Sequence, residues 1–180
     1  MAFENSVFIN CPFDEEYRPL LRALLFTSIY LGLEPKLSQT ISSASIRINQ
    51  IKDHIRSSKF GIHDISLNKS MKDGELPRFN MPYELGLDIG AGEFGNKLLR
   101  TKRILILDAE RYHFQKVLSD IAGQDIAAHN NDPKELIRRV RDWVSLNAAS
   151  LEVPSSSRVW IVYNQFKDDL TTALSESHTD

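Results

Sequence analysis

Ile104-Leu105-Ile106-Leu107-Asp108 is the clearest strand in the sequence. An unbroken apolar run that ends at a charged residue is typical of a buried strand leading into a polar loop. Further apolar runs alternate with helical periods on both sides of it. This alternation predicts an α/β fold, an open parallel sheet of about five strands with helices on both faces. We expect the flavodoxin-like strand order.

The other four strands are predicted from short apolar runs bounded by polar turns. Pro35 cannot donate a ladder hydrogen bond, so the strand that contains it is placed at an edge of the sheet. The predicted strands are Ser6-Val7-Phe8-Ile9-Asn10, residues 33–37, Lys59-Phe60-Gly61-Ile62-His63 and Asp125-Ile126-Ala127-Ala128-His129.

Helices are predicted between these strands from apolar residues at helical spacing. They run from about residue 19 to 31 with Gly32 as the C-cap, from 42–45 onward, through Glu84, from 133 onward and over 159–174. Residues 109–118 are expected to form a short helix or turn. The predicted core faces contain Leu20, Leu21, Leu24, Leu25, Ile29, Ile48, Ile51, Ile55, Met81, Leu85, Ile89, Leu136, Ile137, Val140 and Val144.

The composition is that of an ordinary globular domain. The 180 residues are 42% hydrophobic and 26% charged, and the formal net charge of −2 gives no general attraction to nucleic acid or anionic membranes. The only dense basic cluster is Arg138-Arg139-Val140-Arg141. No apolar run is long enough to span a bilayer, and residues 1–5 lack the basic start of a secretory signal. Cys11 is the single cysteine, so an intramolecular disulfide is excluded. We therefore expect one domain in the cytoplasm.

The predicted helix around Glu84 opens from a polar loop. Asn80 is a candidate N-cap, and Pro82 suits the first helical turn. Glu84 lies one turn in, near the positive end of the helix, where it is either a surface residue that compensates the dipole or a catalytic carboxylate. The loop of residues 67–79 lacks periodicity and is expected to be exposed over the site and mobile without ligand. Gly90, Gly92 and Gly95 are expected to end the helix.

Polar residues follow several predicted strands. Residues 10–14, residues 64–66, Glu84 and Asp108 all belong at the carboxyl ends of parallel strands, where such sheets bind ligands. The chain has no G-x-S-x-G elbow, Walker loop or G-x-G-x-x-G after a strand, which disfavours phosphoryl transfer and dinucleotide redox chemistry. Carboxylates in this position suit cleavage of a glycosidic bond, whose oxocarbenium-like transition state a carboxylate can stabilise or trap.

Three stretches resemble a bacterial family of mostly uncharacterised proteins. That family is similar to nucleoside 2-deoxyribosyltransferases and, more distantly, to TIR domains. In order, Pro12-Phe13, Asp64 and Glu84-Leu85-Gly86 match the Pro-Phe turn, the base-holding aspartate and the glutamate nucleophile of the transferases. Where those enzymes carry a small glycine-containing turn, this chain has Phe79-Asn80-Met81-Pro82-Tyr83. The stretches are Phe8-Ile9-Asn10-Cys11-Pro12-Phe13-Asp14, Ile62-His63-Asp64-Ile65-Ser66 and Arg78-Phe79-Asn80-Met81-Pro82-Tyr83-Glu84-Leu85-Gly86-Leu87.

The resemblance implies an enzyme that hydrolyses or transfers at the N-glycosidic bond of a nucleoside, a nucleotide or NAD. Glu84 would be the nucleophile or oxocarbenium stabiliser. NAD or a nucleotide would be the substrate, with no resident cofactor or metal. The alternative is a non-catalytic TIR-like module that senses a nucleotide or acts as an adaptor. The implied substrate-binding residues are Asn10 and Asp64 for base or sugar, Phe13 and Tyr83 as pocket walls, Arg78 for phosphate, and Pro12, Asp14 and Asn80.

The resemblance also implies a biological setting. It suggests bacterial stress or antiphage defence, with a partner protein of that system, and a homo-oligomer in which a neighbouring subunit completes the site. Residues 90–95 and 120–125 are the segments we expect at such a subunit contact.

Several candidates have plainer interpretations that remain open. Cys11 at a strand end is a possible thiol nucleophile or a small buried residue. Asp64 could contact ribose or form an Asx turn, and with His63 it is only a weak metal signal. Asn10 could hold the turn, and Asp14 could belong to a helix N-terminus. Arg47 is interpreted as a solvated surface residue. Trp143 and Trp160 are assigned to the core or an interface rather than to base stacking.

Overall fold

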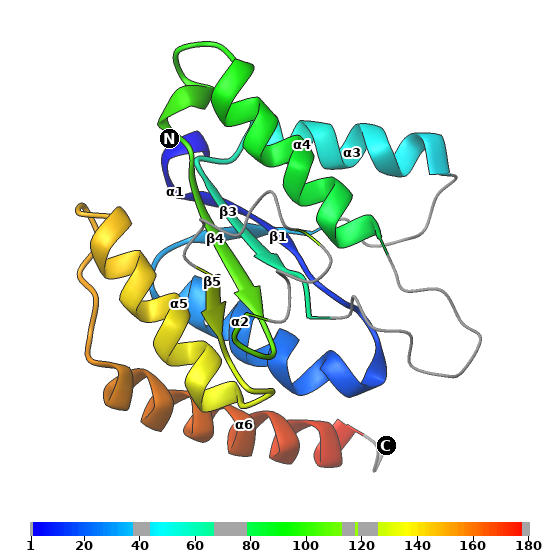
Figure 1. Cartoon of the computed structure of the whole chain (residues 1–180). Coiled ribbons are helices and arrows are strands. Elements are labelled where there is room, and N and C mark those ends of the chain that lie inside the picture. The colour runs from blue at the N-terminus through cyan, green and yellow to red at the C-terminus, as the bar shows by residue number, and fades with distance from the viewer. Residues whose placement is uncertain (1, 38–43, 67–78, 113–117, 119–125, 178–180) are drawn as a thin grey trace.

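The computed structural model describes residues 2–37, 44–66, 79–112, 118 and 126–177. Five strands form one sheet in the order β2-β1-β3-β4-β5, and every neighbouring pair is parallel (Figure 1). The predicted flavodoxin-like sheet is therefore confirmed, with the Pro35 strand at one edge. The strands are β1 Ser6–Asn10, β2 Glu34–Lys36, β3 Phe60–Asp64, β4 Arg103–Asp108 and β5 Ile126–Ala128.

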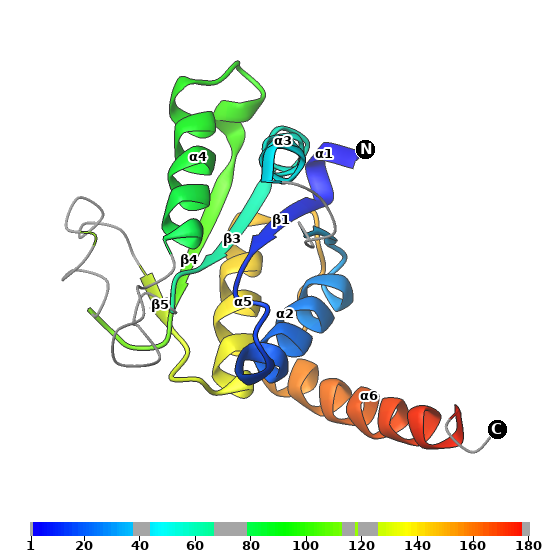
Figure 2. The same ribbon diagram turned by 90° about the vertical axis from the view of Figure 1, so that its right-hand side faces the viewer.

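Helices cover both faces of the sheet. Figure 2 shows α3 and α4 on one side and α2 and α5 on the other, with α6 packed outside α2 and α5 and continuing beyond the body of the molecule. The helices are α1 Ala2–Asn5, α2 Arg18–Tyr30, α3 Ala44–Arg56, α4 Asn80–Phe94, α5 Pro133–Asn147 and α6 Ser156–Ser177, with short 3-10 turns η1 Glu15–Tyr17 and η2 Leu99–Thr101.

The strand side chains alternate between two different environments. One face packs as an apolar core against α2, α5 and α6, and Phe60 meets Trp143 of α5 edge-on at 5.7 Å between ring centroids. On the opposite face, apolar Phe8 and Ile106 are interrupted by polar Asn10 and His63. The polar groups therefore collect under α4. The strand residues of the larger core are Val7, Ile9, Phe60, Ile62, Leu105 and Leu107.

Some predicted details of the helices are wrong. Ile29 is 61% exposed, because it follows Leu20 by nine residues and so points to the opposite side of α2. Asn80 is the first residue of α4, and the N-cap position belongs to Phe79, without a side-chain capping bond. Gly90 and Gly92 lie inside α4, which ends only at Gly95.

Other helix boundaries also differ from the sequence interpretation. The short α1 was not predicted, and α6 begins three residues before Val159 and ends three residues after Leu174. Gly32 does follow α2 with a φ of 84°, a conformation that suits glycine. The predicted loop 67–79 falls outside the described residues except for Phe79, and the segment 120–125 and residues 113–117 of the predicted turn 109–118 also fall outside them.

Candidate functional site

Glu84 is held at the carboxyl ends of the strands by the first turns of α4. Met81 and Leu85, on either side of it in sequence, pack with Ile65 and Ile106 in a small apolar cluster. This packing leaves Glu84 only 5% exposed. The interpretation of Glu84 as a surface residue that compensates the helix dipole is therefore wrong, because its carboxyl group is withdrawn from water.

Arg47 of α3 provides a positive charge beside this carboxyl group. Its Nη2 atom lies 3.6 Å from Oε1 of Glu84, and the Arg47 side chain is 28% exposed. Burial raises the pKa of Glu84 to about 7, although the Arg47 charge opposes the rise. Both protonation states of Glu84 are therefore populated near neutral pH. Arg47, interpreted from the sequence as a solvated residue, belongs to this site.

A chain of buried hydrogen bonds runs beneath Glu84. The Asn10 amide nitrogen donates to the Met81 carbonyl oxygen at 2.9 Å and to Nδ1 of His63 at 3.0 Å. Because Nδ1 accepts this bond, the His63 proton is on Nε2, which donates to Oδ2 of Asp88 at 2.9 Å. These side chains are almost fully buried.

Lys102 completes this chain on the far side of Asp88. Its Nζ atom lies 3.0 Å from Oδ1 of Asp88 and donates to the carbonyl oxygens of Ile55 and Ser58 at the end of α3. Burial alone would raise the pKa of Asp88, but the His63 hydrogen bond and the Lys102 charge outweigh burial and lower it. Asp88 is therefore a paired carboxylate. We call Asn10, His63, Asp88 and Lys102 the α4 network.

Gly61 makes room for this network. A Cβ atom at Gly61 would lie 2.3 Å from Oδ2 of Asp88 and 3.1 Å from Nε2 of His63. A distance below 3.0 Å is not tolerated without movement, so only glycine allows the Asp88 carboxylate to rest on β3.

Asp64 lies at the end of β3 in a second buried cluster. Its Oδ2 atom accepts hydrogen bonds from the Tyr17 hydroxyl at 2.5 Å and from Nε2 of His129 at 3.0 Å. Its Oδ1 atom accepts from the backbone N–H of Ser66 at 3.0 Å and from the Ser66 hydroxyl. Burial would raise the pKa of Asp64, but the donors outweigh it and lower the pKa. The Asx-turn geometry that the sequence left open is present.

His129 cannot activate Ser66 as a nucleophile in this arrangement. Its Nδ1 atom accepts the backbone N–H of Asn131 at 3.1 Å, so its proton is on Nε2. Nε2 also lies 3.1 Å from the Ser66 hydroxyl, but it already carries the proton that it would have to remove. The Asp64 cluster is therefore a structural turn rather than a Ser-His-Asp triad.

Cys11 is influenced by the charges of both Asp64 and Glu84. Burial raises the pKa of its thiol well above the usual value, and the charges of Asp64 and Glu84 raise it further. The thiol is only 3% exposed. A neutral, buried thiol is a poor nucleophile, so this arrangement favours the packing interpretation of Cys11.

The outer residues of the predicted site differ in exposure. Phe13, Tyr83 and Asn80 are exposed. Pro12 is buried, so it shapes the turn after β1 and does not face solvent. Arg78 lies outside the described residues.

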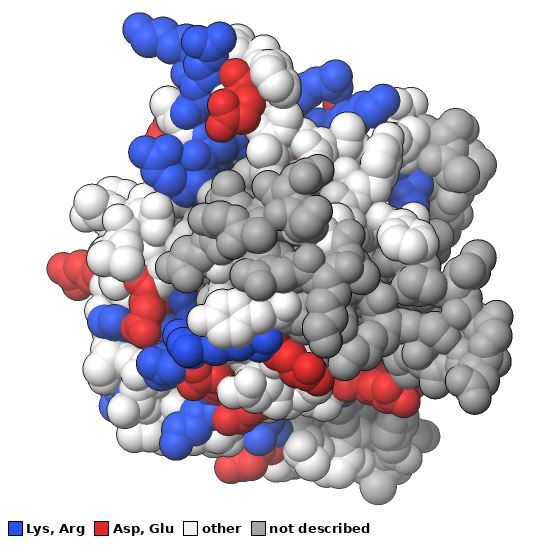
Figure 3. Space-filling view, viewed as in Figure 1, with Lys and Arg blue, Asp and Glu red and all other residues white. Residues whose placement is uncertain are grey.

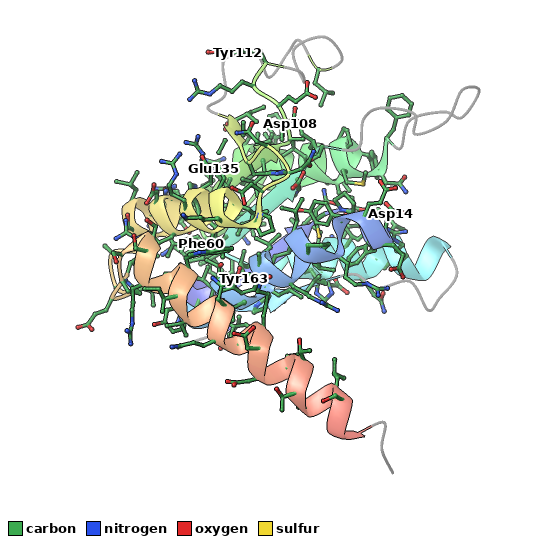
Figure 4. All side chains as sticks on the ribbon, turned by 90° about the horizontal axis from the view of Figure 1, so that it is seen from below. Asp14, Phe60, Asp108, Tyr112, Glu135 and Tyr163 are labelled. Atoms are coloured by element: carbon green, nitrogen blue, oxygen red, sulfur yellow. The ribbon has the colours of Figure 1, made fainter. Side chains whose placement is uncertain are left out.

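Two further aspartates lie near the strand ends. Asp14 is half-buried at the N-cap position of η1, and its carbonyl oxygen accepts the N–H of Tyr17. Asp108 is fully buried, and its carboxylate accepts the N–H of Ala109 at 2.7 Å. Figure 4 shows Asp14 beside the helical segment that leads into α2 and Asp108 at the end of β4. Both positions fit structural roles.

Apart from Arg47, the denser groups of basic side chains lie on other parts of the described surface. Figure 3 shows Lys and Arg gathered where α4 ends and η2 follows, the segment that contains the exposed Lys97, Arg100 and Arg103. In the predicted basic cluster of α5, Arg138 and Arg139 pair with Glu135. That cluster is therefore partly neutralised.

The described residues contain neither a cluster suited to a metal ion nor a helix suited to crossing a membrane. Among them, no group of three or more His, Cys, Asp or Glu side chains is arranged to hold a metal ion. Within the same ranges, no helix combines the length and apolarity needed to cross a membrane.

Comparison with known proteins adds no family assignment: no protein-family model matches the chain, and no curated protein matches it.

The α4 network was only partly visible in the sequence. Asn10 and His63 were singled out, but Asp88 and Lys102 were not. Asp88 falls seven residues after Met81 and four after Glu84, on the face of α4 that carries buried residues. An acidic residue inside an apolar stripe is the signal that could have found it.

Proposed function

We propose that this protein cleaves or transfers at the N-glycosidic bond of a nucleoside, a nucleotide or NAD, with Glu84 as the catalytic carboxylate. The observation that carries the proposal is the burial of Glu84 at the strand ends beside Arg47, with a pKa of about 7. A carboxylate withdrawn from water interacts more strongly with a developing positive charge than a solvated one does.

In the proposed reaction, an oxygen of ionised Glu84 attacks the anomeric carbon of the sugar. The carbon–nitrogen bond breaks, and its electron pair leaves with the base. Water or an acceptor base then attacks the same carbon, its proton passes to solvent, and the bond to Glu84 breaks to restore the carboxylate. With NAD the pyridinium nitrogen takes up the electron pair and nicotinamide leaves as a neutral molecule. NAD therefore needs no proton donor at this step, whereas a neutral nucleoside needs one for its base.

Two of the predicted pocket residues suit an aromatic ligand. Phe13 and Tyr83 are exposed large side chains contributed by the turn after β1 and by α4. Exposed aromatic rings can stack on a base or nicotinamide. We further place the activity in the cytoplasm, in a homo-oligomer, in the defence setting implied by the resemblance.

A non-catalytic nucleotide-binding module is the second candidate. It is favoured over catalysis because the Asn10 amide nitrogen and the Asp64 carboxylate, the groups expected to orient a reacting sugar or base, hydrogen-bond to protein partners instead. A sensor needs a pocket but no reactive carboxylate, so turnover distinguishes the two candidates.

The test is incubation of purified protein with NAD and a panel of nucleosides and nucleotides, with free base as the readout. Glu84→Gln keeps the size of the side chain and removes its charge, and we expect base release to fall about a hundredfold or more. Glu93→Gln, at an exposed position of the same helix, is the matched control and should retain activity. Undiminished release by Glu84→Gln would end the catalytic assignment. No release by wild type, with one ligand raising its melting temperature, would favour the sensor.

A further inference from the structure

Three buried residues share one face of α4. Met81, Glu84 and Asp88 are separated by three and four positions, the spacing that places side chains above one another on a helix. All three are 7% exposed or less. Glu84 therefore lies between two residues through which the α4 network holds the helix.

The two attachments use different parts of α4. At Met81 the network binds the backbone, through the bond from Asn10 to the carbonyl oxygen. At Asp88 it binds the side chain, through His63 of β3. Because Asn10 and His63 are also bonded to each other, both attachments start from the same place on the sheet.

The attachment at Asp88 is also connected to α3, the helix that carries Arg47. Lys102 forms an ion pair with Asp88 and donates hydrogen bonds to the carbonyl oxygens of Ile55 and Ser58, at the end of α3. The same α3 carries Arg47, which lies 3.6 Å from Glu84. The α4 network thus ties together the two helices that contribute the carboxylate and the cation.

We propose that Asn10, His63 and Asp88 are positioning residues that fix the rotation and axial register of α4, and so hold the Glu84 carboxyl group in its buried place beside Arg47. The catalytic part of this inference rests on the proposed function. Apolar contacts of Met81 and Leu85 bury the helix but are not directional. Hydrogen bonds to Met81 and Asp88 specify one register, a role for which buried polar groups are well attested.

The pKa of Glu84 depends on its burial and on the charged and titratable groups near it. Arg47 faces it from α3, and Cys11 faces it from the segment after β1. Burial is the largest cause of the raised pKa of Glu84. A helix that slips or rotates would bring the carboxyl group into water, and its pKa would fall toward the value of about 4.3 for a solvated glutamate.

The experiment measures the pKa of Glu84 by carbon-13 NMR of the labelled carboxyl group, assigned by its absence in Glu84→Gln. Wild type is expected to titrate at about 7. In Asn10→Ala, the expected result is a fall of one pH unit or more, with at least a tenfold loss of base release. The control is Leu136→Ala, a fully buried residue of α5 across the sheet, which should lower the melting temperature and leave the Glu84 titration in place.

An unchanged Glu84 pKa in folded Asn10→Ala would overturn the inference, because a merely structural role lowers stability alone. An equal shift in Leu136→Ala would also overturn it, since the effect would then follow general destabilisation. If Asn10→Ala does not fold, Asn10→Ser keeps one hydrogen-bond donor and takes its place. The titration does not depend on turnover. If wild type releases no base, the proposed function is refuted, but the titration still tests the positioning of Glu84.

Discussion

The Asp88 carboxylate rests on Gly61, so closely that a Cβ atom there would lie 2.3 Å from Oδ2. Asp88 cannot simply move aside, because His63 and Lys102 hold its two oxygens. This contact between α4 and β3 has room for a hydrogen atom at Gly61 but not for a methyl group.

Gly61→Ala should lower the free energy of unfolding by about 1–3 kcal/mol or more, the usual cost of an overpacked core. The added methyl group must displace Asp88 from His63 or push α4 away from β3. Urea unfolding measures the loss. Gly86→Ala is the control on α4, where nothing lies within 4 Å of the added Cβ atom, and it should stabilise the helix by up to about 1 kcal/mol. Equal stability of Gly61→Ala and wild type would contradict this account.

Glu84 should make the protein less stable as the pH rises. Its pKa in the folded state is about 7, above the ordinary 4.5, so the folded protein binds more protons than the unfolded chain between these values. The free energy of unfolding therefore falls from about pH 4.5 to about pH 7, by at most about 3 kcal/mol. Glu84→Gln lacks this contribution. Urea unfolding of wild type and Glu84→Gln at pH 5 and pH 8 measures the difference. If the free energy of unfolding changes equally with pH in both proteins, the prediction is refuted.

Arg47→Met should raise the pKa of Glu84 further. The Arg47 charge is the influence that opposes burial, and the pair is partly exposed, so a rise of less than about one pH unit is expected. NMR titration of the Glu84 carboxyl group measures the change. Arg56→Met, on the same helix but paired with Asp53, should leave the titration unchanged. An unchanged Glu84 pKa in Arg47→Met would show that this pair is absent in solution, and a lowered pKa would likewise contradict the prediction.

Cys11 should resist thiol reagents while the protein is folded. Its thiol is buried and its pKa is raised, so little thiolate is available near neutral pH. We expect labelling by a disulfide reagent to be slower than in urea-unfolded protein by about a hundredfold or more. Rapid stoichiometric labelling of the native protein would instead return Cys11 to the list of candidate nucleophiles.

Lys102→Met should cost about 3–5 kcal/mol, because it leaves the buried Asp88 carboxylate without its cation. Adding Asp88→Leu should recover part of this loss, since the unpaired charge is then removed as well. Urea unfolding of the two single variants and the double variant gives the interaction energy. Additive losses would mean that the two side chains are not coupled.

The strands follow from local patterns, and their order is the one expected for sheets of this kind. Val7, Phe60 and Leu105 lie in short apolar runs between helical periods, and the parallel pairing follows from that alternation. Pro35 was enough to place its strand at an edge. The strands themselves and the edge position of Pro35 depend on near neighbours in the sequence, which is why they could be predicted.

The exposure of Glu84 could not be predicted from its neighbours. Ile65 and Ile106 pack against the helix that carries it, and α3 brings Arg47 against it from 37 residues away in the sequence. The pairing of Asp64 with His129 spans 65 residues in the same way. Charged residues are usually exposed, so the burial of Glu84 and Asp64 becomes apparent only from their contacts in the folded structure.

Lys102 has a consequence for the order in which the chain can fold. It follows both α3 and α4 in the sequence, yet its ammonium group joins the end of α3 to Asp88 of α4. During synthesis, the two helices emerge before the residue that ties them together. Their helical turns can form early, because helix formation is local and fast. Their final alignment has to wait until Lys102, the residue before β4, has been added, so it belongs to the late, long-range steps of folding, which are the slow ones.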